Sequence, residues 1–191
     1  MAAILPVGRV IRSVVLVTAY VVPAVIVWAI AGLVLNILPL RTVALIVAVA
    51  YAGAYGLLEA NGRGRPAPPG TSWQVPGGWV RGSPAWRRMM LWGFVLGPGF
   101  LTRNPYAGFG LLLLVLAAVG NVRDGLVLAV ILGAAHAAGR ACALLRDAHG
   151  IDVANYLESV RKLMYWRRFD GYALLTIGGA AMVACLRALA G

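Results

Sequence analysis

Long apolar stretches separated by short polar segments run along the whole chain. Five of them are long enough to cross a bilayer, which takes about 20 mostly apolar residues because lipid offers the backbone no hydrogen-bond partners. They cover residues 13–35, 42–58, 88–119, 125–145 and 171–189. The pattern predicts an all-α polytopic integral membrane protein with five transmembrane helices.

The first two stretches are expected to form an N-terminal transmembrane hairpin over residues 1–58. Arg9 and Arg12 precede the first stretch, and its apolar core is longer than the roughly 7–15 residues of a signal peptide. We interpret it as a retained anchor. The turn at 36–41 is short, so the two helices are expected to pack antiparallel.

The third stretch is too long for one straight helix. Its 32 residues would extend about 48 Å, against a hydrocarbon core of about 30 Å. Asn104 and Pro105 form a helix-start signal, with asparagine as the N-cap and proline at the first helical position. We therefore predict two half-helices, 89–96 and 105–119, around an irregular centre. The residues that mark this helix break are Gly97, Pro98, Gly99 and Pro105.

Two further segments differ in composition from the apolar stretches. Residues 59–87 are rich in glycine, proline, arginine and tryptophan, which suits a cytoplasmic interfacial linker at the headgroup level of a membrane. Residues 151–168 have apolar side chains at helical spacing with basic ones between them, which predicts an amphipathic surface helix. That helix belongs to a predicted three-span C-terminal bundle, 88–191.

Composition supports the membrane assignment. The chain is 61% hydrophobic and 12% charged, whereas soluble domains are roughly one-quarter charged. The net charge is +11, and the predicted loops divide the basic residues unequally, with 12 on one side and 3 on the other. The three are Arg41, Arg123 and Arg187. By the positive-inside rule, we expect a multi-pass protein of the plasma (inner) membrane with a cytoplasmic N-terminus and a C-terminus outside.

This distribution also bears on partners. Orientation and contact with anionic lipid headgroups account for most of the positive charge, so we expect the bilayer as a partner and no nucleic acid. Small-residue faces recur on the predicted helices, and such faces let helix backbones approach closely. They make a membrane protein partner or a homodimer plausible.

Ionisable residues within predicted spans are functional candidates because their burial in lipid is costly. Arg103 and Asn104 lie at the break, where the N-terminus of the second half-helix would attract an anion. His136 and Arg140 are four residues apart and share one helical face. We predict these four as candidate substrate-binding residues. The structural alternative is that the arginines extend to lipid phosphate or the interface and His136 donates to a carbonyl.

The sequence contains no recognisable catalytic constellation. Cys142 and Cys185 lie in different spans without a Cys-x-x-Cys motif, and no zinc-binding motif, nucleotide-binding glycine loop or pair of carboxylates within the spans occurs. Haem ligation by His136 and His149 would need partner ligands that the chain lacks. We therefore predict no catalytic residue, no metal site and no cofactor.

A helix broken at glycine and proline, then a small-residue helix, then a basic stretch leading into a glycine-containing helix occupy residues 91–183. This order resembles one three-helix repeat of the CcdA/DsbD family of transmembrane thiol electron carriers. The resemblance implies a fold in which two such repeats enclose a redox site. In that family a cysteine follows the proline of the broken helix, whereas here Gly99 follows Pro98 and Tyr106 follows Pro105. No functional residue of the family is therefore transferred to this chain.

Three functions remain open at this point. The favoured hypothesis is a non-catalytic scaffold or accessory subunit of a membrane complex, because small-residue faces are frequent and titratable groups in the spans are few. The first alternative is a carrier for a small anion or metabolite that uses the broken-helix site. The second alternative is a degenerate thiol-disulfide electron carrier, which would require Cys142 and Cys185 to lie within disulfide range.

Overall fold

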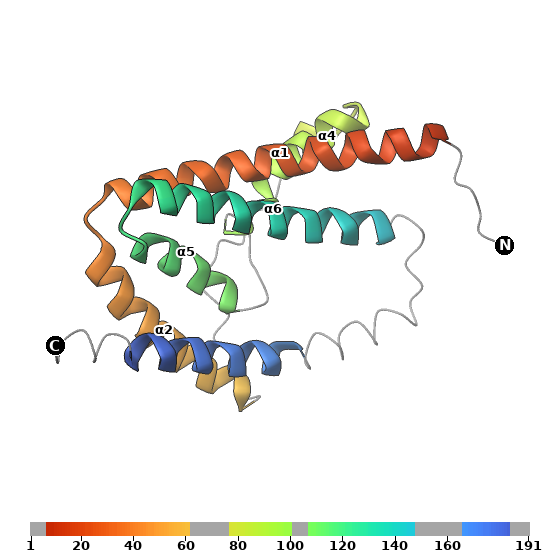
Figure 1. The fold of residues 1–191 in the computed structure, drawn as a ribbon. Helices are drawn as coiled ribbons and strands as arrows, with labels where there is room; N and C mark the ends of the chain where they lie inside the picture. Colours follow the sequence, from red (N-terminus) through yellow and green to blue (C-terminus); the bar gives the residue numbers. More distant parts are fainter. Residues whose placement is uncertain (1–6, 62–76, 101–106, 148–165, 184–191) are drawn as a thin grey trace.

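The computed structural model describes residues 7–61, 77–100, 107–147 and 166–183, and these residues are helical with short turns and no strand. The helices are α1 (Val7–Ile37), α2 (Arg41–Ala60), α3 (Gly77–Val80), α4 (Ala85–Val95), α5 (Gly108–Ala118) and α6 (Val122–Asp147). Residues 166–183 form a further helix, which we call the C-terminal helix (Figure 1, blue). The predicted all-α class is confirmed for these residues.

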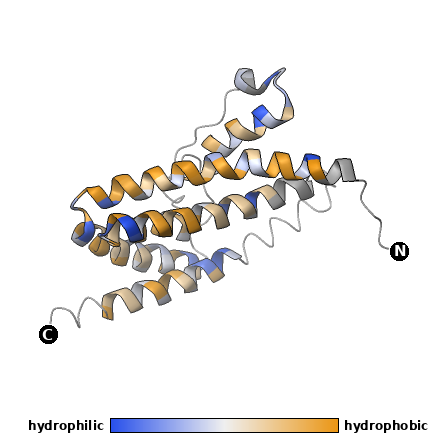
Figure 2. Cartoon of the chain, turned by 45° about the horizontal axis from the view of Figure 1, so that its top comes forward, coloured by the Kyte–Doolittle hydropathy of each residue, from blue (hydrophilic) through white to orange (hydrophobic). Residues whose placement is uncertain are grey.

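Three of the described helices are long and apolar enough to cross a membrane. They comprise Ile11–Ile37, Arg41–Ala60 and Val122–Ala141, while α5 is apolar but shorter. Large apolar side chains, such as Ile11, Ile46 and Ile131, are exposed on their outer faces, and Figure 2 shows apolar residues along the long helices. This surface would be unfavourable in water and is the kind that lipid covers, which indicates a membrane protein.

The longest interface joins α1 to α6. One face of α6 has a small residue at every fourth position, which brings the two backbones close. These residues are Gly125, Ala129, Gly133, Ala137 and Ala141, all buried. Gly125 lies against Asn36, Gly133 against Trp28, and the last two alanines pack in one cluster with Tyr20. Because the α1 partners occur in reverse order, the two helices are antiparallel.

The third stretch is interrupted as predicted: α4 ends at Val95 and α5 begins at Gly108. Gly93 and Gly97 lie against Tyr20 and Ala24, near the middle of α1. Further along α1, the Phe109 ring meets the Trp28 ring edge to face at 5.9 Å, and the Asn36 side chain reaches the Leu116 carbonyl at 3.0 Å. Both half-helices therefore follow α1 in the same direction, without reversing at the break.

The observed boundaries differ from the predicted ones. The first half-helix begins at Ala85 rather than at 89, because Pro84 occupies its N-cap in an extended conformation. The second begins at Gly108 rather than at 105, and Asn104 and Pro105 lie outside the described residues. Most of the predicted linker (62–76) and of the predicted surface helix (151–165) also lies outside them.

A second layer is formed by α2, α5 and the C-terminal helix (Figure 1). Along α2, Ala44, Ala48, Ala52 and Gly56 form a buried stripe. Gly178 of the C-terminal helix lies against Ala52, and Gly171 lies against Ala60, so these two helices are antiparallel. Two leucines, Leu111 of α5 and Leu174 of the C-terminal helix, fill the space between the three helices.

Asn36 ties the two layers together at one end of the bundle. Its amide group donates to the carbonyl oxygens of Gly32, at 2.9 Å, and Leu116, at 3.0 Å, and its carbonyl accepts from the Gly120 N–H at 2.9 Å. Gly120 has a φ of +70°, which glycine adopts without strain. The end of α1 is thereby bound to the turn between α5 and α6.

The α1–α6 interface yields a prediction about stability. Adding a side chain at Gly133 forces it against Trp28, because even a Cβ there would lie 2.7 Å from the Trp28 Cβ. We expect Gly133→Leu to lower the free energy of unfolding by about 1–3 kcal/mol, measured by reversible unfolding in mixed detergent micelles. Gly139→Leu on the same helix, where nothing lies within 4 Å, is the control; it also replaces a glycine within the helix and should not lower the free energy of unfolding. Equal effects would contradict the packing described here.

Candidate functional site

The first polar feature lies where α4 ends. Arg140 of α6 donates a hydrogen bond from Nη1 to the Leu96 carbonyl oxygen at 2.7 Å. Leu96 is the C-cap residue of α4, so the guanidinium stands at the negative end of that helix dipole. Tyr20 of α1 is buried in one cluster with Ala137 and Ala141, the residues on either side of this arginine on α6. The cation thus joins α4 to α6 where α6 packs against α1.

His136 lies one helical turn before Arg140 and faces the same break. Its ring centroid is 4.6 Å from that of Phe109, and its Nε2 points toward Gly99. A Cβ at Gly99 would lie 2.7 Å from this nitrogen, and Gly99 has a φ of +78°, so both space and backbone conformation require glycine there. Nε2 is buried and has no hydrogen-bond partner in the described part of the chain.

The structure therefore brings two of the four predicted site residues to the break. His136 and Arg140 share a face of α6, as their spacing predicts, and that face meets residues 96–99. The turn residues Gly97, Pro98 and Gly99 are buried. Arg103 and Asn104 lie outside the described residues, so the predicted convergence of Arg103 on the other two stays a prediction.

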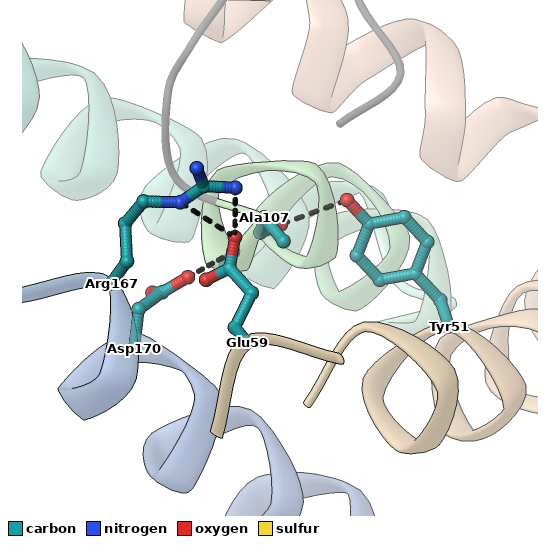
Figure 3. A network of polar contacts seen from close by, with 6 residues as sticks. Tyr51, Glu59, Ala107, Arg167 and Asp170 are labelled. Atoms are coloured by element: carbon teal, nitrogen blue, oxygen red, sulfur yellow. Dashed lines mark hydrogen bonds and ion pairs between the residues drawn. The ribbon is translucent and has the colours of Figure 1, made fainter. Parts of the chain in front are cut away.

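The second polar feature lies where α5 begins. Asp170 of the C-terminal helix accepts a hydrogen bond at Oδ2 from the Gly108 N–H at 2.8 Å. Beside it, the Tyr51 hydroxyl of α2 donates to the Ala107 carbonyl at 2.9 Å (Figure 3). The Asp170 carboxylate stands at the positive end of the α5 dipole, which is the position where the sequence predicts that an anion would bind.

Glu59, near the end of α2, completes this cluster. Its side chain is only 2% exposed, and its Oε1 accepts from the Arg167 guanidinium at 3.2 Å and 3.4 Å. Figure 3 also shows its carboxyl group beside that of Asp170. The other oxygen, Oε2, is buried without a hydrogen-bond partner among the residues that the structure describes. We call Glu59, Arg167 and Asp170 the carboxylate cluster.

Sequence reasoning did not find the carboxylate cluster. It predicted no pair of carboxylates within the spans, because it ended the second span at 58 and began the fifth at 171. In the structure α2 continues to Ala60 and the C-terminal helix already includes residue 166, so Glu59 and Asp170 lie on packed helices. The available signal was that each acidic residue borders an apolar stretch. Their proximity could not be predicted from the sequence, because 111 positions separate them.

Side chains of opposite charge stand at the two ends of the break. Arg140 stands at the end of α4, and Asp170 stands at the start of α5, each of the sign that the adjacent dipole favours. Glu59 is paired with Arg167. The Asp170 contact pairs a backbone N–H at the start of α5, the Arg140 contact adds a charged donor to the last carbonyl of α4, and both join separate helices.

The metal and thiol predictions concern residues that the structure describes only in part. Within the described ranges, no group of three His, Cys, Asp or Glu side chains is placed to hold a metal ion. The side chain of Cys142 and the whole of Cys185 lie outside the described residues, so the distance between the two thiols stays untested.

Comparison with known proteins adds no relative. The chain matches no protein-family model, no curated protein and no solved structure. The resemblance of residues 91–183 to a CcdA/DsbD repeat therefore stays a prediction from the sequence, and the functional argument rests on the geometry above.

The Arg140 contact yields a second stability prediction. Removing Arg140 leaves the Leu96 carbonyl with only the longer bond from the Gly99 N–H, at 3.2 Å, and removes a hydrogen bond from a charged donor. We therefore expect Arg140→Met to cost about 1.5–3 kcal/mol of unfolding free energy. Arg123→Met, at an exposed arginine on the same helix, is the matched control and should cost less than about 0.5 kcal/mol. The measurement is again unfolding in mixed micelles. A loss for Arg140→Met no larger than for Arg123→Met would refute this role.

Proposed function

We propose that the protein is a non-catalytic scaffold or accessory subunit of a membrane complex in the plasma (inner) membrane. One observation carries this proposal: both ends of the broken helix are occupied by the chain's own side chains, Arg140 and Asp170. A carrier for an anion would use the N-terminus of α5 to bind its substrate. Here that position belongs to an internal carboxylate, and the charged groups serve to hold helices together.

The helix directions support the five-span topology of this proposal. The broken segment and the C-terminal helix run in the direction of α1, while α2 and α6 run against it. Exposed arginines at one end of the bundle are Arg12, Arg87, Arg88 and Arg168, and those at the other are Arg41 and Arg123. By the positive-inside rule the first end faces the cytoplasm, which leaves the N-terminus inside and the C-terminus outside.

A partner helix has a suitable surface on the second layer. Gly53 of α2 and Gly179 of the C-terminal helix have nothing within 4 Å of where a side chain would begin, and Gly178 approaches the Gly53 nitrogen. Outward-facing glycines let another helix approach closely in a membrane, where packing rather than water exclusion drives association. We call Gly53 and Gly179 the glycine face and propose that the partner subunit, or a second copy of this chain, docks there.

Co-purification tests this function. Full-length tagged protein extracted in a mild detergent should bring down a stoichiometric membrane protein or a second copy of itself. Gly179→Leu and Gly53→Leu fill the glycine face, and we expect each to reduce the recovered partner at least about tenfold, which corresponds to about 1.4 kcal/mol of binding free energy. The yield of the tagged chain itself is the measure of intact folding.

Gly139→Leu is the matched control for these variants. Gly139 is equally open, but it lies on α6, away from α2 and the C-terminal helix, so the variant should retain the partner. A wild-type protein that purifies as a lone monomer would argue against the scaffold. Loss of the partner in all three variants alike would argue against the glycine face.

A second candidate function is a carrier for a small anion or metabolite, and the observation that favours it is His136. Its Nε2 is buried at the break without a described hydrogen-bond partner, next to Arg140, and a buried unpaired polar atom costs free energy unless a ligand or water pairs with it. Purified protein in liposomes should then accumulate labelled anions, and His136→Phe should abolish uptake while the fold persists. Uptake equal to that of empty liposomes would exclude the carrier.

A further inference from the structure

Glu59 and Asp170 bring two carboxyl groups together between α2 and the C-terminal helix. Glu59 is buried and Asp170 is half-buried, and Figure 3 shows the two carboxyl groups beside each other. The donors that the described chain offers them are the Arg167 guanidinium and the Gly108 N–H. An ionised carboxylate has acceptor atoms only, so two neighbouring carboxyl groups hydrogen-bond to each other only if one of them carries a proton.

The surrounding charges lead to the same count. From the C-terminal helix, the cation that faces Glu59 is Arg167, at 3.2 Å. From α2, the neighbouring titratable groups are Tyr51 and Tyr55, whose rings stack at 4.5 Å, and neither adds a positive charge. From α5, the Gly108 N–H contributes only a dipole. Among the described residues, two carboxylates would thus face one guanidinium, whereas one shared proton makes the cluster neutral.

A buried acceptor is left over in this site. Glu59 Oε2 has no hydrogen-bond partner in the described chain, although the side chain is 2% exposed. A structural ion pair would be expected to use both oxygens, because an unpaired oxygen in an apolar interior is costly. A proton shared with Asp170 would give this oxygen the hydrogen bond that it lacks.

We propose that Glu59 and Asp170 bind one exchangeable proton between them, and that its release loosens the C-terminal helix from α2 and α5. In the releasing step the O–H bond of the protonated carboxyl breaks, its electron pair stays on the carboxylate, and the proton passes to water or a buffer base. Two carboxylates then repel each other across the contact between α2 and the C-terminal helix. Asp170 is also the residue that holds the start of α5, so the movement reaches the break.

The direction of the pH dependence follows from linkage. The folded cluster holds a proton that the separated side chains would release, so its contribution to stability is present at low pH and is lost as pH rises through the release. One released proton changes the opening equilibrium by up to about tenfold for each pH unit. Protection of residues 166–183 against hydrogen exchange should therefore fall with rising pH beyond the intrinsic chemical effect.

Infrared spectroscopy of the full-length protein in lipid nanodiscs tests the proton itself. Wild type should show the carbonyl band of a protonated carboxylic acid at neutral pH, and the band should vanish as pH rises. Glu59→Gln and Asp170→Asn should each abolish it. Asp124→Asn, at an exposed aspartate in the first turn of α6, is the control and should retain it. Replacing sodium by choline separates a bound proton from a bound cation and should leave the band unchanged.

Hydrogen exchange measured by mass spectrometry tests the loosening. Glu59→Gln keeps a neutral group of the same shape, so its C-terminal helix should stay protected at every pH, while wild type and Asp124→Asn lose protection together. Absence of the band in wild type, or its persistence in both carboxylate variants, would overturn the shared proton. A wild-type band that titrates without any change in exchange over 166–183 would overturn the coupling. If either variant fails to fold, the titration and exchange of wild type alone decide both points.

Discussion

An interrupted helix inside an apolar bundle leaves backbone groups that lipid cannot satisfy, and the rest of this structure is arranged around that constraint. Each half-helix end receives a side chain from a different element: Arg140 pairs with the last turn of α4, and Asp170 pairs with the first turn of α5. Tyr51 takes the carbonyl just before α5. Three helices that are distant in sequence are thereby required to meet at one break, which explains why the bundle has two layers joined there.

Small residues make this arrangement sterically feasible. The glycines and alanines at every fourth position of α6 let α1 approach closely, and the end of α4, to which Arg140 donates, packs against the same α1. The stripe of Ala44 to Gly56 on α2 does the same for the C-terminal helix and its Asp170. The polar contacts thus depend on close packing, since neither charged side chain has its partner on its own helix.

Much of this architecture can be predicted from the sequence. Apolar length predicts the helices, since a chain in lipid has few other ways to pair its backbone. Gly97, Pro98 and Gly99 predict the break because they remove donors or permit a backbone conformation that other residues avoid. The spacing of His136 and Arg140 predicts a shared face. These inferences succeed because each depends on neighbours within a few residues along the chain.

The side chains that surround the break could be identified only from the tertiary structure. Glu59 and Asp170 each stand at the edge of an apolar stretch, and nothing local marks them as partners of one another or of α5. Packing decides that Asp170 occupies the dipole end to which the sequence assigned an outside anion, and that Arg140 is paired with a carbonyl. The sequence by itself determined the membrane class, the helices and the interruption, because these follow from backbone hydrogen bonding in lipid. The contents of the site follow from contacts between residues far apart, which only the folded chain brings together.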